Sequence, residues 1–365
     1  MALDRLTLAN FRNHRETLID GTRPFNLLVG ENGAGKTNVL EAISLFAPGR
    51  GLRRAALADM AAQHGPGHFA VSARLDTGQG EHLTLGTGIE AQRPGKRLVQ
   101  INGAPSPANR LAEWLSIGWL TPAMDRLFAE GAGGRRRFLD RLVLALAPGH
   151  AAMASRLENA VRERNRLLSD LREPDPQWLD AIELQVVEAG AEVSGARARV
   201  VEALDAALAM LPSEPFALPR LAYLPGGPLE ADALAAALRQ GRGTDRAAGR
   251  TLTGPHRDEL SVTMASKNQP AADCSTGEQK AMLIAIVLAH SSLLEEGDAA
   301  QRPRLLLLDE VAAHLDPLRR EALFDRLRQG KAQVWLTGTE RAPFAAIEGE
   351  MAVWEVSQGT LERSS

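Results

Sequence analysis

The sequence has almost no cysteine and few aromatic residues. Its only cysteine is Cys274, so neither an intramolecular disulfide nor a cysteine-based zinc site can form, which suits a reducing compartment. Aromatic residues make up 4%, which argues against a stacking platform for single-stranded bases. No apolar run approaches the roughly 18 residues that a spanning helix needs, and Asp4, Arg5 and Arg12 interrupt the N-terminal region where a signal peptide would be apolar. We therefore expect a cytoplasmic protein with no membrane partner.

A net positive charge is also lacking. The formal net charge is −3, whereas a strongly basic balance is the usual footprint of a nucleic-acid binder. Any DNA contact must therefore come from local clusters, although chance grouping on an exposed surface explains such clusters equally well. The candidate clusters are Arg50, Arg53 and Arg54, and Arg135, Arg136 and Arg137.

The order of elements is strand, glycine-rich loop and helix near the N-terminus. Apolar residues from Phe25 predict a short buried strand that stops at Gly30, and residues 37–46 have helical spacing. Residues 67–101 alternate like β-strands between glycine-bearing turns. At 365 residues the chain exceeds the usual size of one core, so two lobes are expected.

The middle of the sequence is helical. Two long helices are predicted at residues 151–171 and 178–211, joined by a turn-rich segment. They should pair as an antiparallel arm about 30 to 50 Å long, at 1.5 Å per residue. Residues 212–227 and 241–249 are interpreted as loops that lead back to a β-rich segment.

The strongest motif is a phosphate-binding loop. Residues 30–37 read GENGAGKT and match GxxxxGK[ST] between a strand and a helix, the context that the pattern requires. Glycines let backbone amides approach the β-phosphate, Lys36 bridges the β- and γ-phosphates, and Thr37 is a ligand for Mg²⁺. The nucleotide-binding candidates are Gly30, Glu31, Asn32, Gly33, Ala34, Gly35, Lys36, Thr37 and Asn38.

An acidic pair follows an apolar strand far downstream. Residues 305–308 are all leucine and end in Asp309 and Glu310. The pattern is typical of a Walker B site, in which Asp309 would hold Mg²⁺, usually through water, and Glu310 would act as general base. Read alone, such a pair is also typical of a strand end that meets solvent. The phosphate-binding loop favours the catalytic interpretation.

A third motif, CSTGEQK at residues 274–280, precedes an apolar helix at residues 281–288. It is consistent with a helix cap, in which Ser275 or Thr276 binds free amides and Glu278 completes a capping box. Alternatively, Ser275, Gly277 and the helix N-terminus form a second anion-binding surface. One polypeptide cannot easily fold that surface onto its own Lys36, so a second copy would supply it.

These motifs together resemble the ABC-type ATPases, and most closely the RecF family, which is related to SMC heads. The resemblance spans essentially the whole chain. It implies an α/β ATPase head built from residues 1–120 and 249–365, with a mostly helical lobe and a short antiparallel arm inserted at residues 121–248. Further segments that carry it are NFRNH at 10–14, RRFLD at 136–140, TGPHRD at 253–258 and AHLD at 313–316, which ends in Asp316.

The resemblance also implies a function. ATP and Mg²⁺ would be sandwiched in a head-to-head homodimer, which binds DNA at gaps or single-strand/double-strand junctions and helps RecR and RecO to place RecA during DNA repair, replication and the SOS response. Hydrolysis would be slow. The residues concerned are Lys36, Thr37, Asp309 and Glu310 of one subunit, Ser275 and Gly277 of the other, and Arg12 and Asn13 beside the nucleotide.

The sequence departs from the ABC pattern at several positions. Cys274 begins the signature-like segment where leucine often does, and no clear Q-loop glutamine is found, residues 121–125 being a positional candidate. Thr337 replaces the switch histidine, which makes slow hydrolysis the expectation. Gln63 and His64 are expected at the surface. Arg257 is interpreted as a structural residue, ion-paired with Asp258 or a neighbour.

Other P-loop proteins share part of this pattern. A nucleotide-binding subunit of a transporter has the same motifs, but the long interval between Lys36 and Ser275 is not typical of it. An SMC protein would have a long heptad run in that interval. A P-loop kinase or GTPase would not need the segment from Ser275 to Glu278 before a helix. The RecF-like interpretation is therefore favoured, with the transporter subunit as the alternative.

Overall fold

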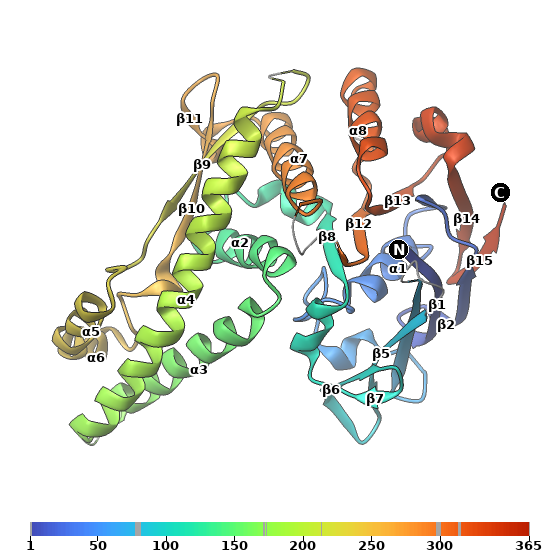
Figure 1. Cartoon of the computed structure of the whole chain (residues 1–365). Helices are drawn as coiled ribbons and strands as arrows, with labels where there is room; N and C mark the ends of the chain where they lie inside the picture. Colours follow the sequence, from blue (N-terminus) through green and yellow to red (C-terminus); the bar gives the residue numbers. More distant parts are fainter. Residues whose placement is uncertain are drawn as a thin grey trace. The chain divides into compact units, whose positions relative to one another are not determined.

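The computed structural model describes residues 2–76, 82–170, 172, 174–212, 214–296, 301–312 and 315–364. The chain forms two compact units, the first from residues 1–125 and 290–365 and the second from residues 126–289 (Figure 1). The expected boundaries were 120 and 248, and the second of them differs most from the structure. Because the second unit extends to residue 289, the signature-like segment belongs to the second unit. No helix in the described ranges is long and apolar enough to cross a membrane.

The first unit contains an antiparallel sheet near the N-terminus. Its strand order is β2-β1-β4-β5-β6-β7. Strand β4 alternates between buried residues, such as Val71 and Leu75, and more exposed ones, which is the pattern of a sheet with one face on the core. The β-rich character predicted for residues 67–101 is confirmed. The strands are β1 Ala2–Phe11, β2 His14–Asp20, β4 Phe69–Asp76, β5 His82–Glu90, β6 Arg93–Ile101 and β7 Ala104–Pro105.

A second, mostly parallel sheet of the first unit carries the phosphate-binding loop. Its order is β15-β14-β3-β13-β12-β8. Strand β3 pairs in parallel with both β13 and β14, so that Phe25 lies between Val334 and Met351. This interior place explains why β3 is almost entirely buried and, apart from Asn26, apolar. The strands are β3 Phe25–Val29, β8 Ser116–Leu120, β12 Arg304–Leu308, β13 Gln333–Gly338, β14 Met351–Ser357 and β15 Thr360–Arg363.

Helix α1 (Lys36–Ser44) shares one core with both sheets. Val39 and Ile43 of α1 are fully buried in the same cluster as Leu8 of β1 and Leu307 of β12. Arg97 of β6 donates to the carbonyls at the C-terminal end of α1 and in the turn that follows, including Gly49 O at 2.7 Å. The other helices are η1 Leu57–Met60, η2 Ala108–Glu113, η3 Pro122–Arg126, α8 Pro317–Gln329 and η8 Ala342–Glu350.

The second unit is built around an antiparallel pair of long helices, α3 (His150–Ser169) and α4 (Pro176–Ala209) (Figure 1). Arg156 of α3 pairs with Glu188 of α4 at 2.6 Å and Arg164 with Glu183 at 2.9 Å. Later residues of α3 therefore contact earlier residues of α4, so the two helices are antiparallel. The predicted arm is confirmed. Residue 171, its expected end, lies outside the described residues. The other α-helices are α2 Ala132–Leu146, α5 Ala231–Gln240 and α7 Thr276–Leu293.

Two segments predicted as loops are regular structure, and those predictions were wrong. Within residues 212–227, strand β9 (Pro219–Leu224) pairs antiparallel with β10 (Glu259–Met264), and β11 (Gln269–Pro270) extends the sheet. Within residues 241–249, helix α6 (Arg242–Ala248) forms because the carboxylate of Asp245 is buried and accepts from Arg164 Nη1 at 2.6 Å. These long-range bonds leave no signal in local sequence.

The interpretation of Arg257 as part of a buried ion pair was also wrong, because its side chain is exposed and Asp258 is bound by other residues. The Asp258 carboxylate is buried and accepts from Arg197 Nη1 at 2.9 Å, from Ser194 Oγ at 3.1 Å and from the hydroxyl of Tyr223. Burial and the bond to Asp258 raise the pKa of Tyr223, so the phenol stays protonated and keeps donating. Arg257, the last residue of the 3₁₀ turn η4 (Pro255–Arg257), is exposed.

Candidate active site

The loop between β3 and α1 has the backbone of a phosphate-binding loop. Gly33 and Gly35 have φ of +84° and +119°, values that favour glycine. A Cβ on Gly33 would meet nothing within 4 Å, whereas one on Gly35 would lie 2.8 Å from the amide of Asn13 and 2.9 Å from His14 Nε2. The loop is therefore open to a ligand at Gly33 and packed from behind at Gly35.

Residues from both ends of the chain hold this loop. Asn13 Nδ2 and the backbone N–H of Gly359 each donate to Ala34 O at 2.9 Å. The Nε2 of His14 lies 3.1 Å from Gly35 O. Burial lowers the pKa of His14, so the ring is neutral near pH 7 and can donate from this nitrogen. Sequence reasoning did not assign His14 to the site, because only the folded β1–β2 turn brings it to the loop.

Lys36 is almost fully buried beneath the loop. Its Nζ donates to Gly30 O at 2.6 Å and to Glu31 O at 2.9 Å. Burial lowers the pKa of Lys36, while the nearby carboxylates of Glu310 and Asp309 counteract this. The predicted lysine and the predicted acidic pair therefore share one electrostatic environment in the first unit.

The two halves of the predicted site meet through a hydroxyl group. Thr37 Oγ1 donates to Asp309 Oδ1 at 2.8 Å, although the two residues are 272 positions apart. Thr337 Oγ1 of β13 donates to the same oxygen at 2.9 Å. Burial raises the pKa of Asp309 despite both bonds, and a bound cation would relieve that cost. Thr37 and Asp309 thus offer oxygen atoms of the kind that Mg²⁺ prefers.

Glu310 has an unusual backbone conformation that Thr337 fixes. Its φ is +54°, which is uncommon for a residue with a side chain. Its backbone N–H donates to Thr337 Oγ1 at 2.8 Å. One hydroxyl therefore accepts from Glu310 and donates to Asp309, and so holds both acidic residues. Sequence reasoning noted Thr337 as a departure from the ABC pattern but did not find this role.

A polar network links the predicted N-terminal residues to α1. Arg12 binds the fully buried Glu41 through Nε and Nη2, at 2.9 and 2.8 Å. Arg53 Nη1 binds Glu41 at 3.1 Å and Asn38 Oδ1 at 2.6 Å, and Asn38 Nδ2 donates to Asn13 Oδ1 at 2.7 Å. Arg12, Asn13 and Asn38 therefore lie together beside the loop, as predicted, with Arg12 held in an ion pair. Contact of Arg12 with a nucleotide stays a prediction.

A hollow of about 530 Å³ adjoins the loop. Its mixed polar and apolar walls come from the end of β3, from the loop, from the end of β14 and from the turn that follows β14. Among the described residues, no group of three His, Cys, Asp or Glu side chains could hold a metal, and Mg²⁺ held by one or two side chains and by phosphates does not need one. The lining residues are Val29, Gly30, Glu31, Asn32, Gly33, Ala34, Glu355, Val356, Ser357 and Gln358.

The signature-like segment begins α7 with a reciprocal cap. Glu278 Oε2 accepts from Ser275 N at 2.9 Å, and Ser275 Oγ accepts from Glu278 N at 3.4 Å. The bond from Lys267, followed by those from Ser275, lowers the pKa of Glu278 to about 2. Ser275 and Gly277 are exposed, and a Cβ on Gly277 would meet nothing within 4 Å. The predicted capping box is confirmed, while binding of an anion stays a prediction.

The remaining predicted positions lie next to the acidic pair, at the surface and at the start of α8. Residues 121–125 directly follow β8, whose last residue Leu120 accepts from Asp309 N at 2.9 Å, so they begin next to the acidic pair. Gln63 and His64 are exposed, as expected. Asp316 caps α8 by accepting from Arg319 N at 2.9 Å. Residues 313 and 314 of the AHLD segment lie outside the described residues.

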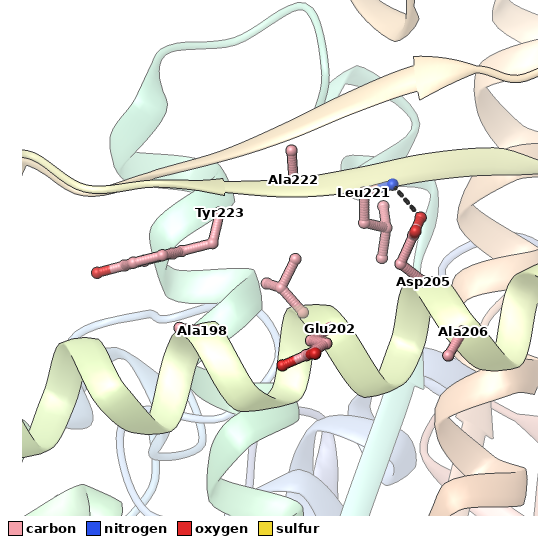
Figure 2. A pocket seen from close by; sticks show the side chains of 8 residues that line it. Ala198, Glu202, Asp205, Ala206, Leu221, Ala222 and Tyr223 are labelled. Atoms are coloured by element: carbon pink, nitrogen blue, oxygen red, sulfur yellow. Dashed lines mark hydrogen bonds between the residues drawn. The ribbon is translucent and has the colours of Figure 1, made fainter.

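A second hollow, of about 400 Å³, lies in the second unit between α4 and β9 (Figure 2). Glu202 and Asp205 contribute carboxylates to it, and Asp205 accepts from Leu221 N at 2.7 Å. The described lining of this hollow contains no glycine-rich backbone whose amides could bind phosphate groups. The hollow beside the glycine-rich loop is therefore the better candidate for a nucleotide.

The chain is similar to known proteins along almost its whole length. A family model described as the RecF/RecN/SMC N terminal domain matches residues 2–362. The chain is 48% identical to the DNA replication and repair protein RecF of Mesorhizobium japonicum, over 98% of this chain and 97% of that one. It is 44% identical to the protein of the same name from Caulobacter vibrioides, over 99% and 98% of the two chains.

Solved structures share the fold at lower identity. A structure of the recombination mediator protein RecF with ATP superimposes with a TM-score of 0.86 at 20% identity, covering 100% of this chain and 98% of that one. An Smc head domain from Pyrococcus furiosus, bound to the C-terminal domain of ScpA, gives 0.56 at 14% identity, covering 100% and 96%. These matches establish an ABC-type head and do not favour a transporter subunit.

Proposed function

This chain belongs to the RecF family of DNA replication and repair proteins, and we propose that it is a slow ATPase whose ATP-bound homodimer binds gapped or junction DNA. The observation that carries the proposal is the contact of Thr37 with Asp309 at 2.8 Å, beneath an open glycine-rich loop. A phosphate-binding loop and a buried acidic residue at this distance are the two halves of an ATP–Mg²⁺ site.

The loop and Asp309 bind the phosphates and Mg²⁺ in this proposal. Backbone amides around Gly33 and the N-terminus of α1 bind phosphate oxygens. Lys36 exchanges its present carbonyl partners for the β- and γ-phosphates, and Thr37 and Asp309 hold Mg²⁺. When bound, Mg²⁺ neutralises negative charge that develops on the phosphate oxygens. The adjoining hollow of about 530 Å³ gives room for part of the nucleotide.

Glu310 orients and deprotonates the attacking water in the proposed reaction. Its backbone is fixed by Thr337, which cannot take up a proton as a switch histidine could. We infer from this difference that hydrolysis is slow. Slow hydrolysis suits a protein in which bound ATP mainly controls assembly.

The second anion-binding surface supports a dimer. Ser275 and Gly277 are exposed at the N-terminus of α7 and belong to the second unit, whereas Lys36 and Asp309 belong to the first. In the proposed homodimer, Ser275 and Gly277 of one copy bind the γ-phosphate held by Lys36 of the other. ATP then joins two subunits because each contributes half of the site.

We propose that the dimer acts in the cytoplasm, where it helps RecR and RecO to place RecA on gapped DNA. The relatives named above are DNA replication and repair proteins, and the superimposed RecF structure belongs to the RecFOR pathway. Both facts support this set of partners.

Light scattering with and without ATP and Mg²⁺, together with binding of a gapped duplex, tests the proposal. Lys36→Met removes a charged donor to the phosphates and is expected to weaken ATP affinity about 10- to 100-fold. Ser275→Arg should keep ATP binding and lose the dimer, because the bulky cation obstructs the partner's nucleotide. A wild-type protein that binds ATP yet stays monomeric and ignores DNA at every concentration would refute the proposal.

Replacing Thr337 tests the role of its hydroxyl. Thr337→Val keeps the shape and removes both bonds, to Asp309 and from Glu310. Because bonds to charged groups contribute about 1.5–3 kcal/mol, we expect kcat to fall about 10- to 100-fold with KM for ATP changed only a few-fold. Thr337→Ser is the matched control and should restore most of kcat. Equal activities of the valine and serine variants would contradict this role.

A further inference from the structure

Arg257 stands at the end of a turn that the second unit holds rigidly. The turn η4 follows Gly254, whose φ is +130°. It packs against Gly226 so closely that a Cβ added to Gly226 would lie 2.5 Å from Arg257 Cβ. The next residue, Asp258, is anchored by four donors, including Gly226 N at 2.8 Å and Arg197 Nη1 at 2.9 Å. The backbone of Arg257 is therefore fixed, while its side chain is exposed.

Two arginines of α2 lie next to this turn. Arg136 Nη1 donates to Asp258 O at 2.8 Å, directly after Arg257. Arg137 is exposed. A Cβ atom added to Gly133 would lie 3.2 Å from Arg137 Nη1 and 3.8 Å from Arg136 Nη2, so these two guanidinium groups are close to the same point. Arg136 and Arg137 are thus neighbours, and the charge of Arg257 acts on Arg136; we call these three residues the arginine cluster.

The positive charges of the cluster are not held in ion pairs with described residues of the second unit. Arg135, in contrast, pairs with Glu259 at 2.7 Å. Within the described ranges, no carboxylate lies within 4.0 Å of the guanidinium groups of the cluster. Burial, followed by the charges of Arg197 and Arg257, lowers the pKa of Arg136, while the carboxylates of Glu259 and Asp140 partly counteract this. Like charges that repel one another at a fixed surface gain free energy when an anion binds between them.

The start of α2 adds to this positive potential. Its N-cap is Gly131, no side chain caps it, and its first turn has no acidic residue. Positive potential at a helix N-terminus favours anions. Three carboxylates lie nearby. Glu259 and Asp140 act on Arg136 but are paired with Arg135 and Arg197. A Cβ on Gly134 would lie 3.9 Å from Glu130 Oε2 and 4.0 Å from Arg137 Nη2, so Glu130 offsets only part of the charge of the cluster.

We propose that the arginine cluster binds the phosphodiester backbone of DNA. Arginine forms paired hydrogen bonds with phosphate oxygens, and backbone contacts of this kind supply most of the affinity for DNA without reading sequence. The net charge of −3 means that DNA must be held at a local site. This inference rests on the proposed function and names the residues through which the DNA is bound.

Fluorescence anisotropy of a labelled gapped duplex, with ATP and Mg²⁺ at several salt concentrations, tests the cluster. Arg137→Ala and Arg257→Ala are suitable because both side chains are exposed, whereas Arg136 also holds the turn. Each change should reduce the slope of log K against log[salt] by about 1, and the double variant by about 2, similarly for all sequences. Affinity for a fluorescent ATP analogue and ATP-driven dimerisation should stay unchanged.

Arg199→Ala is the matched control, since Arg199 is an exposed arginine of α4 that lies outside the cluster. Its salt slope should equal that of the wild type. If the double variant binds DNA like the wild type at every salt concentration, the inference fails while the proposed function stands. An equal loss in Arg199→Ala overturns the inference as well, because general charge then explains the effect. If the wild type binds no DNA, both fail.

Discussion

A Glu310→Gln variant is expected to hydrolyse ATP about 100- to 1,000-fold more slowly than the wild type, because a positioned general base contributes roughly that much to a rate. Glutamine has nearly the same shape and can keep the backbone bond to Thr337, so affinity for ATP should change only a few-fold. Phosphate release and binding of a fluorescent ATP analogue measure the two quantities separately. The ATP-bound dimer should also persist longer in this variant.

Glu340→Gln is the matched control for this prediction. Glu340 is an exposed carboxylate of the first unit that follows β13, so its loss should leave hydrolysis unchanged. If Glu310→Gln releases phosphate at the wild-type rate, then Glu310 is not the base and another group must orient the water.

An Arg164→Leu variant is expected to lose about 3–5 kcal/mol of stability, the usual cost of removing one partner from a buried ion pair. Arg164 is 0% exposed and donates to Glu183 at 2.9 Å, Asp245 at 2.6 Å, Thr251 Oγ1 at 2.8 Å and Leu238 O at 2.7 Å. Without it, the carboxylate of Asp245 stays buried with no cation beside it. Urea denaturation measures the loss, and hydrogen exchange of α3 and α6 locates it.

Arg166→Leu provides the comparison on the same helix. Arg166 forms an exposed pair with Glu163 at 2.5 Å, and such surface pairs contribute about 0–1 kcal/mol. The two variants remove the same side chain from sites two residues apart. Equal and small losses in both would mean that the buried network of α3 does not hold the second unit together.

The sequence was most informative where function constrains a continuous segment. Strand β3 was predicted at the residues where it is found, and the loop and α1 followed as expected. A glycine loop between an apolar strand and a helix depends on local backbone geometry, which the residue types reveal directly. Thr37 and Asp309 were each assigned to Mg²⁺ from their motifs, and the structure brings their side chains into direct contact.

Residues whose roles depend on distant partners could not be found in this way. Thr337 binds the acidic pair only because β13 lies beside β12 in the sheet. Likewise, α6 forms around Asp245, whose partner Arg164 is 81 residues away. Arg257 was expected to pair with Asp258 or a neighbour, yet Asp258 is bound by Arg197, 61 residues earlier. Local patterns carry no record of such pairings.

The position of β3 in its sheet has a consequence for the order in which the protein can fold during synthesis. Phe25 pairs with Val334 and Met351, so neither neighbour of β3 exists when the phosphate-binding loop leaves the ribosome. At about 5–20 residues per second, the ribosome needs roughly 15 to 65 seconds to supply them. The second unit is continuous from residue 126 to 289 and is complete earlier. The nascent chain therefore has a folded arm before it has a nucleotide site.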